Sequence, residues 1–196
     1  MRVELRADGL HIEGYVNVPG RVSARPVITR KHGKVLEVIE QRAFSNAISK
    51  NGNIKLLLDH DPGRVLASTG DGSLMLKEDR VGLRAEAVIT DAEVIENAQR
   101  LRGWSFDMQN IEDSIEERAD GLPLRHVKAF DMTEVSLILH KNPVYSATSI
   151  EVRAEGEEEI EYRAEERRVE VSKVAPVQPD YTQFENRISE ARIAKW

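Results

Sequence analysis

Leu56-Leu57-Leu58-Asp59-His60-Asp61-Pro62 is an apolar run that ends in a polar turn carrying an imidazole. Together with Ile54, its apolar side chains fall on both parities of an extended chain. A strand of this kind is typically central in a sheet or covered on both faces, whereas a half-buried strand alternates. We therefore expect residues 54–60 to form such a strand, with His60 where it ends.

Two other stretches carry a hydroxyl and a carboxylate beside apolar residues. They read Gly103-Trp104-Ser105-Phe106 and Asp131-Met132-Thr133-Glu134-Val135-Ser136-Leu137. Together the three stretches contain the imidazole, the hydroxyl and the carboxylate that a serine hydrolase needs. None of them is diagnostic alone, because a serine on a polar strand face is usually only a solvated hydroxyl.

Alternation of apolar and polar residues dominates the first 153 residues. It predicts further strands at residues 10–18, 35–39, 73–76, 83–89, 104–111, 127–130 and 134–139. The helical spacing of residues 43–48 predicts one helix, which stops at Asn51-Gly52. Thr90-Asp91-Ala92-Glu93 is a capping box that opens a second helix, through about Leu101. We expect a mainly β fold with helices (α+β), in which a closed, mostly antiparallel β-barrel is flanked by two or three helices.

Strand parity predicts where the polar groups point. In the strand that carries Ser105, Phe106 belongs to the apolar parity, so the Ser105 side chain points the other way. In the last predicted strand Val135 and Leu137 form the apolar face, which turns Glu134 outward. If both strands contribute their apolar faces to one barrel, Ser105 and Glu134 lie on its outer wall, where a protein substrate can reach them.

Composition excludes several classes of protein. The chain has 196 residues, of which 5% are aromatic and 32% charged, so the core must consist mainly of Val, Ile, Leu and Ala. It has no cysteine, which excludes a disulfide framework, a thiolate metal site and a cysteine nucleophile. The start is charged, and no run approaches the about 20 apolar residues of a membrane span. We expect a soluble, intracellular protein that does not bind membranes.

Charge divides the chain into two parts. Residues 154–196 contain 11 acidic and 7 basic residues, which accounts for most of the net charge of −6. The first 153 residues are nearly neutral and have no basic stripe, which disfavours nucleic-acid binding. We expect residues 1–153 to form the barrel domain and to fold without residues 154–196, an acidic tail that is partly helical or flexible.

Six elements in this order resemble the prohead maturation proteases of tailed bacteriophages, a family related in fold to the herpesvirus assembly protease. The elements are Glu37-Val38-Ile39-Glu40-Gln41-Arg42-Ala43-Phe44 with Arg42 where glycine is usual, Leu58-Asp59-His60-Asp61, Glu78-Asp79-Arg80-Val81-Gly82-Leu83, the helix that leads to Gly103, Gly103-Trp104-Ser105-Phe106, and Asp131 to Leu137 followed by Pro143. The resemblance covers roughly residues 10–150. It departs at Asp107-Met108, where the family has glycine and an aromatic residue.

The resemblance implies a serine endopeptidase with an assemblin-like barrel. Ser105 would be the nucleophile, His60 the general base and Glu134 the carboxylate that orients the imidazole. The enzyme would work inside the assembling procapsid, in the bacterial host cytoplasm. There it would cleave the scaffold protein or the scaffold segment of the major capsid protein, and often itself. These proteins are the expected partners, and a homodimer is left open.

Several alternatives remain at this point. Asp131 competes with Glu134 for the third catalytic role, and Lys141-Asn142 is the candidate for the oxyanion hole. His60 with Asp59 or Asp61 would make a metal site only with further ligands, and the other histidines show no such spacing, so neither a metal nor a cofactor is expected. A catalytically silent barrel that serves as a scaffold or assembly component is the second hypothesis.

Overall fold

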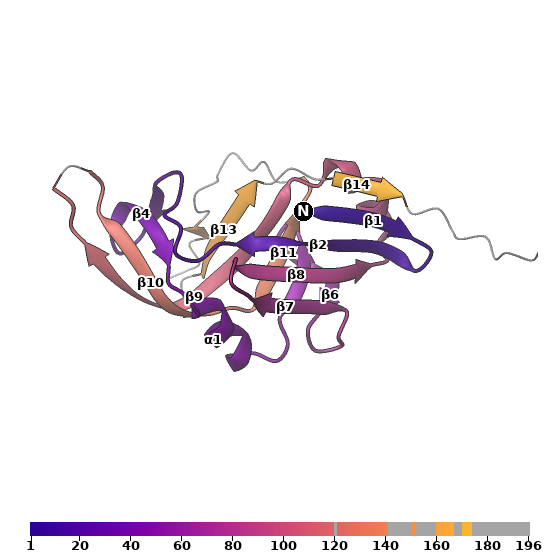
Figure 1. Cartoon of the computed structure of the whole chain (residues 1–196), viewed down its shortest axis with the longest axis horizontal. Helices are drawn as coiled ribbons and strands as arrows, with labels where there is room; N and C mark the ends of the chain where they lie inside the picture. Colours follow the sequence, from indigo (N-terminus) through magenta and orange to yellow (C-terminus); the bar gives the residue numbers. More distant parts are fainter. Residues whose placement is uncertain (120, 141–149, 152–159, 167–169, 174–196) are drawn as a thin grey trace, which may run out of the picture.

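The computed structural model describes residues 1–119, 121–140, 150–151, 160–166 and 170–173 (Figure 1). These residues are mainly β-strands in two open sheets. The smaller sheet has the strand order β14 (Glu170–Lys173), β1 (Arg2–Arg6), β2 (Gly9–Asn17), β8 (Leu83–Ile89) and β7 (Leu74–Glu78). The larger sheet has the order β3 (Val27–Thr29), β4 (Gly33–Ile39), β10 (Leu124–Asp131), β9 (Gly103–Glu116), β11 (Glu134–Ile138), β5 (Lys55–Leu58) and β6 (Asp61–Ser68).

The long strand β9 is the centre of the larger sheet. Its second half pairs with β10 and its first half with β11, both antiparallel. Beside β11 lies β5, in parallel register from Glu134↔Lys55 to Leu137↔Leu58. The first half of β9 also pairs with β13 (Ile160–Glu166), which in turn pairs with β12 (Ile150–Glu151). The central position predicted for residues 54–60 is confirmed for β5, which has β11 on one edge and β6 on the other.

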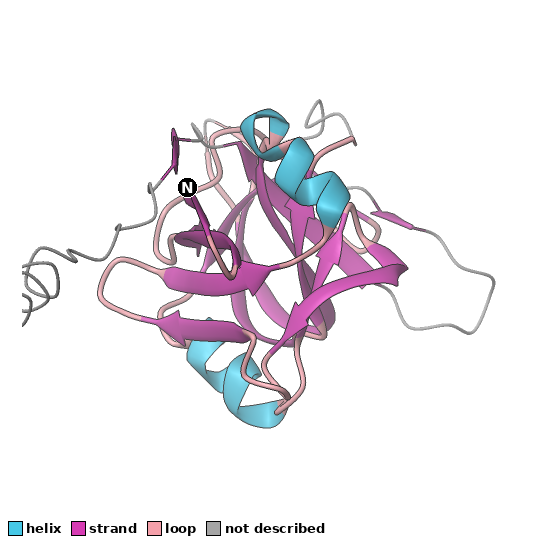
Figure 2. Cartoon of the chain, turned by 90° about the vertical axis from the view of Figure 1, so that its right-hand side faces the viewer, coloured by secondary structure: helices cyan, strands magenta, loops and turns pink. Residues whose placement is uncertain are grey.

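Helices cover the strands from opposite sides (Figure 2). The first predicted helix is confirmed as α1 (Ala43–Lys50). The second, α2 (Ala92–Glu96), is shorter than expected and continues only as a 3₁₀ turn at Ala98–Arg100. The predicted capping box is wrong by one residue, because the side chain of Asp91, and not that of Thr90, accepts a hydrogen bond from the Val94 amide.

The core is aliphatic, as the composition predicts, with three phenylalanines at its centre. Phe44 of α1 meets Phe106 of β9 and Phe130 of β10 edge-on, with ring centroids 5.1 and 5.3 Å apart. Strands β2 and β9 also touch, as do β6 and β8, so the two sheets share this core. The predicted mainly β fold with few helices is confirmed, while closure of the sheets into one barrel stays a prediction.

Strands also occur beyond residue 153, where a charged tail was expected. Strand β13 adds to β9, and β14 adds in parallel to β1 at the edge of the smaller sheet. Neither strand was predicted from the sequence. The division of the chain at residue 153 stays a prediction about which part folds on its own.

The expected exposure of Ser105 and Glu134 on an outer wall is wrong. Their parity is as predicted, since Phe106 and Val135 face the core. However, Ser105 is only 1% exposed and Glu134 only 6%. The reason is that this face is covered: hydrogen-bonded side chains of His60 and Ser136 lie against Glu134, and the main chain of β13 lies against Ser105.

Candidate active site

His60 lies at the tip of the β5–β6 hairpin. Leu58 pairs with Asp61, so Asp59 and His60 are the two residues of the turn, and both have positive φ, 51° and 61°. Two successive residues with positive φ are the signature of the tight turn that matches the twist of a hairpin. Because glycine is favoured at such positions, a histidine there costs stability, and the turn fixes the direction of its imidazole.

Asp59 fastens this turn to the end of β11. Its two carboxylate oxygens accept hydrogen bonds from the amides of Leu139 and His140, at 2.8 and 3.0 Å. Its own amide donates to the Leu137 carbonyl at 2.9 Å. Asp59 therefore holds the hairpin tip against the neighbouring strand, which positions His60 beside β11.

Glu134 is the first residue of β11, and its side chain meets the imidazole. A hydrogen bond joins Nδ1 of His60 to Oε1 of Glu134. The hydroxyl of Ser136 donates to Oε2 of Glu134 at 3.0 Å and accepts from the main-chain amide of His60 at 3.2 Å. The imidazole and the carboxylate are thus held by each other and by Ser136.

The competing carboxylate, Asp131, lies elsewhere. Its oxygens accept hydrogen bonds from Nζ of Lys50 at 3.1 Å and from Nδ2 of Asn110 at 3.0 Å. These contacts lower the pKa of Asp131, the amide of Asn110 having the larger effect and Lys50 the next. The structure therefore brings Glu134 to His60 and directs Asp131 to Lys50.

Ser105 lies on β9 directly opposite Ser136 of β11. The Cβ atoms of such a cross-strand pair are about 4.5–5.5 Å apart on the same face of the sheet. Ser105 therefore belongs to the same polar layer as His60 and Glu134. Its hydroxyl donates a hydrogen bond to the main-chain carbonyl of Arg163 in β13, at 2.7 Å.

Asp107, the departure from the family pattern, fixes the start of β11. Its carboxylate accepts hydrogen bonds from the amides of Thr133 and Glu134, at 2.8 and 2.9 Å, and from the Thr133 hydroxyl at 2.7 Å. Burial raises the pKa of Asp107 although these hydrogen bonds oppose the effect. Aspartate at this position thus holds the main chain that carries Glu134.

Sequence reasoning missed three positioning residues: Asp59, Asp107 and Ser136. Only Ser136 left a readable signal, since it shares the parity of Glu134 two residues earlier. The bonds of Asp59 and Asp107 run to main-chain amides about 80 and 26 residues away, which no local pattern reveals. The oxyanion-hole candidates Lys141 and Asn142 lie outside the described residues. Within the described part of the chain no three potential metal ligands gather.

A family model described as caudovirus prohead serine protease matches residues 1–163. The chain belongs to this family. The resemblance read from the six sequence elements is confirmed, and membership makes the chain a hydrolase of the serine peptidase class that serves phage capsid maturation. No curated protein and no solved structure matches the chain. The match with the prohead protease family ends inside β13, ten residues beyond the boundary expected at residue 153.

Membership of the prohead protease family also gives the setting. Its members act within the assembling procapsid in the host, and association with procapsid components follows. None of the helices in the described ranges is long and apolar enough to cross a membrane.

Proposed function

We propose that the chain is a serine endopeptidase in which Ser105 is the nucleophile, His60 the general base and Glu134 the orienting carboxylate. The observation that carries this proposal is the hydrogen bond between Nδ1 of His60 and Glu134, in the layer that also holds Ser105. With Nδ1 bound to the carboxylate, the proposed proton transfer uses the other ring nitrogen, Nε2.

The chemistry is an acyl transfer in two halves. His60 takes the Ser105 proton as the oxygen attacks a peptide carbonyl, and returns it to the leaving amine, which departs with the C-terminal part of the substrate. A water molecule then attacks the acyl-enzyme with His60 again as base, and Ser105 is regenerated. Glu134 keeps the tautomer fixed and stabilises the imidazolium without taking the proton.

The proposed substrates are the phage scaffold protein or the scaffold segment of the major capsid protein, inside the procapsid, and self-cleavage belongs to the same proposal. Family membership supports this assignment. Closure of the two sheets into an assemblin-like barrel is the matching proposal for the fold, and the contacts of β2 with β9 and of β6 with β8 support it.

The test is covalent labelling of the full-length protein by a fluorophosphonate, together with cleavage of a scaffold-derived substrate. We expect an adduct at Ser105, and loss of both adduct and cleavage in Ser105→Ala. The matched control is Ser114→Ala, which removes a hydroxyl from the same strand outside the polar layer. An intact protein that neither labels nor cleaves under assembly conditions would favour the alternative, a catalytically silent scaffold component.

A further inference from the structure

We propose that β13 occupies the edge of β9 on which a peptide substrate binds, and that Glu37 and Arg125 select the side chains of that peptide. The proposal rests on the proposed function, because it takes Ser105 as the nucleophile. It adds a binding mode and a substrate class: an extended peptide with an acidic residue, any residue, and then arginine immediately before the attacked bond.

Strands β13 and β9 form one ladder. The two strands are antiparallel from Glu161↔Met108 to Glu166↔Gly103, and Ala164 lies opposite Ser105. Addition of an extended peptide to a sheet edge is a common mode of peptide recognition, in which main-chain hydrogen bonds give affinity and alternate side chains give specificity. In the structure this edge is filled by a segment of the same chain.

The proposed nucleophile contacts the main chain of β13. The Ser105 hydroxyl donates to the carbonyl oxygen of Arg163, at 2.7 Å. A serine nucleophile attacks the carbon of a peptide carbonyl and gives its proton to the base, so this hydrogen bond marks the place of the attacked carbonyl and must break before attack. We therefore place the attacked bond of a substrate where the bond between Arg163 and Ala164 lies. Ser105 is only 1% exposed while β13 is in place, so a substrate can reach it only after β13 has left.

Two alternate side chains of β13, those of Glu161 and Arg163, bind charged partners in other strands. The guanidinium of Arg163 donates from Nε and Nη2 to the two carboxylate oxygens of Glu37, at 2.6 and 2.8 Å. Two residues earlier, Glu161 accepts from Nη1 of Arg125 at 2.7 Å. All four side chains are buried, and the fork of two parallel bonds favours arginine over lysine.

The receiving groups belong to the body of the protein. Arg125 of β10 donates from Nε to Asp113 of β9 at 2.7 Å and from Nη1 to Glu37 of β4 at 3.1 Å. Both selecting residues, Glu37 and Arg125, therefore keep a partner outside β13. A buried charge costs several kcal/mol unless it is paired, and β13 brings one carboxylate and one guanidinium that match the charges already present. A substrate strand with the same charges would be accepted, and one with reversed charges rejected.

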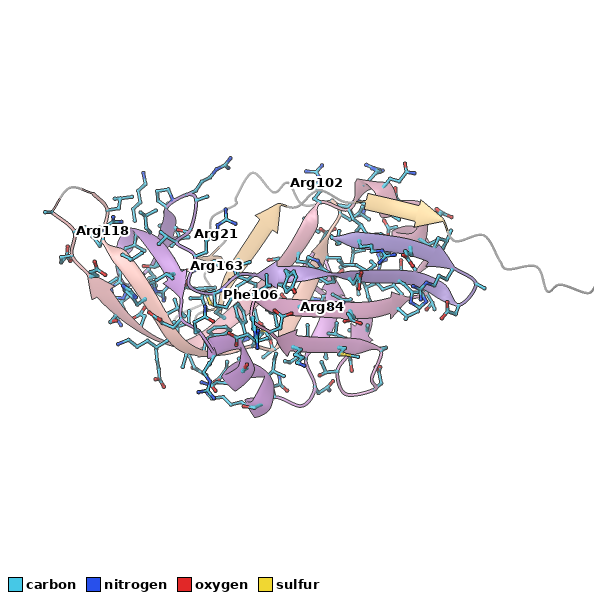
Figure 3. All side chains as sticks on the ribbon, in the orientation of Figure 1. Arg21, Arg84, Arg102, Phe106, Arg118 and Arg163 are labelled. Atoms are coloured by element: carbon cyan, nitrogen blue, oxygen red, sulfur yellow. The ribbon has the colours of Figure 1, made fainter. Side chains whose placement is uncertain are left out.

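The test uses the full-length protein and the variant Arg163→Glu, which sets a carboxylate against Glu37. The matched control is Arg118→Glu, the same change at an exposed arginine far from Arg163 in Figure 3. Two rates are measured: fluorophosphonate labelling of Ser105, and hydrogen exchange of the amides of residues 103–108. We expect both rates to rise at least about tenfold in Arg163→Glu and to stay unchanged in Arg118→Glu.

Each other result counts against the proposal in a different way. Faster exchange with labelling at a measurable but unchanged rate would mean that β13 does not obstruct the nucleophile. An unchanged rate of hydrogen exchange in Arg163→Glu would mean that the ion pair between Glu37 and Arg163 does not keep β13 on β9. No labelling of any variant, with faster exchange in Arg163→Glu, would overturn the peptidase function itself and this proposal with it.

Selection by charge has its own test in the opened variant. A synthetic peptide with the sequence of residues 159–167 should protect Ser105 of Arg163→Glu from labelling. The same peptide with glutamate in place of the arginine that corresponds to Arg163 should protect at least about tenfold more weakly. In the double variant Glu37→Arg with Arg163→Glu we expect slow exchange to return. Equal protection by the two peptides would overturn the role of Glu37, even if the double variant fails to fold.

Discussion

At the scale of single residues, His60 holds a conformation that side chains rarely adopt. Its φ of 61° follows the positive φ of Asp59 in a two-residue turn where glycine is the usual second residue. Residues in such conformations collect at functional sites, where the surrounding structure over-determines them. Here Asp59 binds the turn to the end of β11, and Glu134 binds the imidazole ring. The strained turn thus holds the imidazole in one orientation.

Substitution of the candidate hydroxyl and of the two candidate carboxyl groups should lower kcat by different amounts. We expect Ser105→Ala to lower kcat by about 10⁶-fold and Glu134→Gln by about 10⁴-fold, by analogy with triads of this type. Asp131→Asn should change kcat by less than about threefold, because its partners are Lys50 and Asn110. Cleavage of a scaffold-derived substrate by the three variants checks the order. A larger loss in Asp131→Asn than in Glu134→Gln would transfer the third role to Asp131.

Arg42 gives a second prediction at this scale. It precedes α1 with a φ of 71°, which explains why the family usually has glycine there. We expect Arg42→Gly to raise the free energy of unfolding by up to about 1 kcal/mol, since relief of the left-handed strain exceeds the entropy cost of glycine in the unfolded chain. Urea unfolding measures the change. Arg42→Ala keeps the strain, and equal stabilisation by alanine would contradict this explanation.

At the scale of elements, α1 is capped from another part of the chain. The carboxylate of Glu78, at the end of β7, accepts hydrogen bonds from the amides of Arg42 and Ser45, at 2.8 and 2.7 Å. These amides have no partner within the helix. The cap depends on the tight β7–β8 turn, in which a Cβ on Gly82 would lie 2.1 Å from the Asn17 carbonyl oxygen.

Two substitutions that weaken this cap should destabilise the protein to different degrees. We expect Glu78→Ala to lower the free energy of unfolding by about 1–2 kcal/mol, and Glu78→Gln by less, because its amide oxygen still accepts one bond. The loss of stability follows because α1 carries Phe44, which packs in the core against Phe106. Urea unfolding of both variants, with Lys77→Ala as the neighbouring control, provides the measurement. Equal losses for glutamine and alanine would mean that the carboxylate oxygens are not the cap.

Sequence patterns predicted the elements whose faces differ in polarity. Strands β2, β8 and β11 and helix α1 were found because their periodicity records which side faces the hydrophobic core. Strand β13 was missed because its buried side chains, Glu161 and Arg163, are charged, and charged residues are rarely buried without partners. Those partners, Glu37 and Arg125, lie 126 and 36 residues away along the chain, so no local window contains the pair that explains the burial.

The candidate site, too, was predictable from the sequence only in part. The motifs predicted His60, Ser105 and Glu134, and parity predicted that Ser105 and Glu134 share the face opposite the core. Their burial was not predictable, because it depends on the pairing of β9, β11 and β5 and on the main-chain contact of Ser105 with β13. Parity distinguishes two faces of a strand but does not tell whether the polar face is covered.

At the scale of the whole molecule, the described hydrophobic core lies entirely within residues 3–139. We therefore expect a chain that ends at Arg153 to keep a single cooperative thermal transition, but at a lower Tm. The loss arises because β9 and β1 lose a partner strand and Glu37 loses the Arg163 guanidinium. Calorimetry of the two chains measures the difference. A truncated chain without a transition would show that the tail is required for folding.

The cluster around Asp113 makes stability depend on pH. Burial alone would raise the pKa of Asp113, but hydrogen bonds from Lys31, Arg125 and His32 outweigh it and lower the pKa from 3.8 to about 2. A lowered carboxyl pKa stabilises the fold above the unfolded pKa, and this stability is lost as the pH falls toward the folded pKa. In urea unfolding, the advantage of the wild type over Asp113→Asn should therefore shrink between about pH 5 and pH 2. A constant difference across that range would contradict this assignment.

Because β13 and β9 belong to one chain, their docking is a unimolecular equilibrium that dilution leaves unchanged. A tethered segment acts at an effective concentration that is typically millimolar for short flexible linkers. A peptide substrate supplied at micromolar concentration would lose this competition for the edge, whereas a substrate crowded into a closed shell would not. Turnover would then respond to how densely the substrate is packed around the enzyme, and assays in dilute solution would record a largely self-occupied protein.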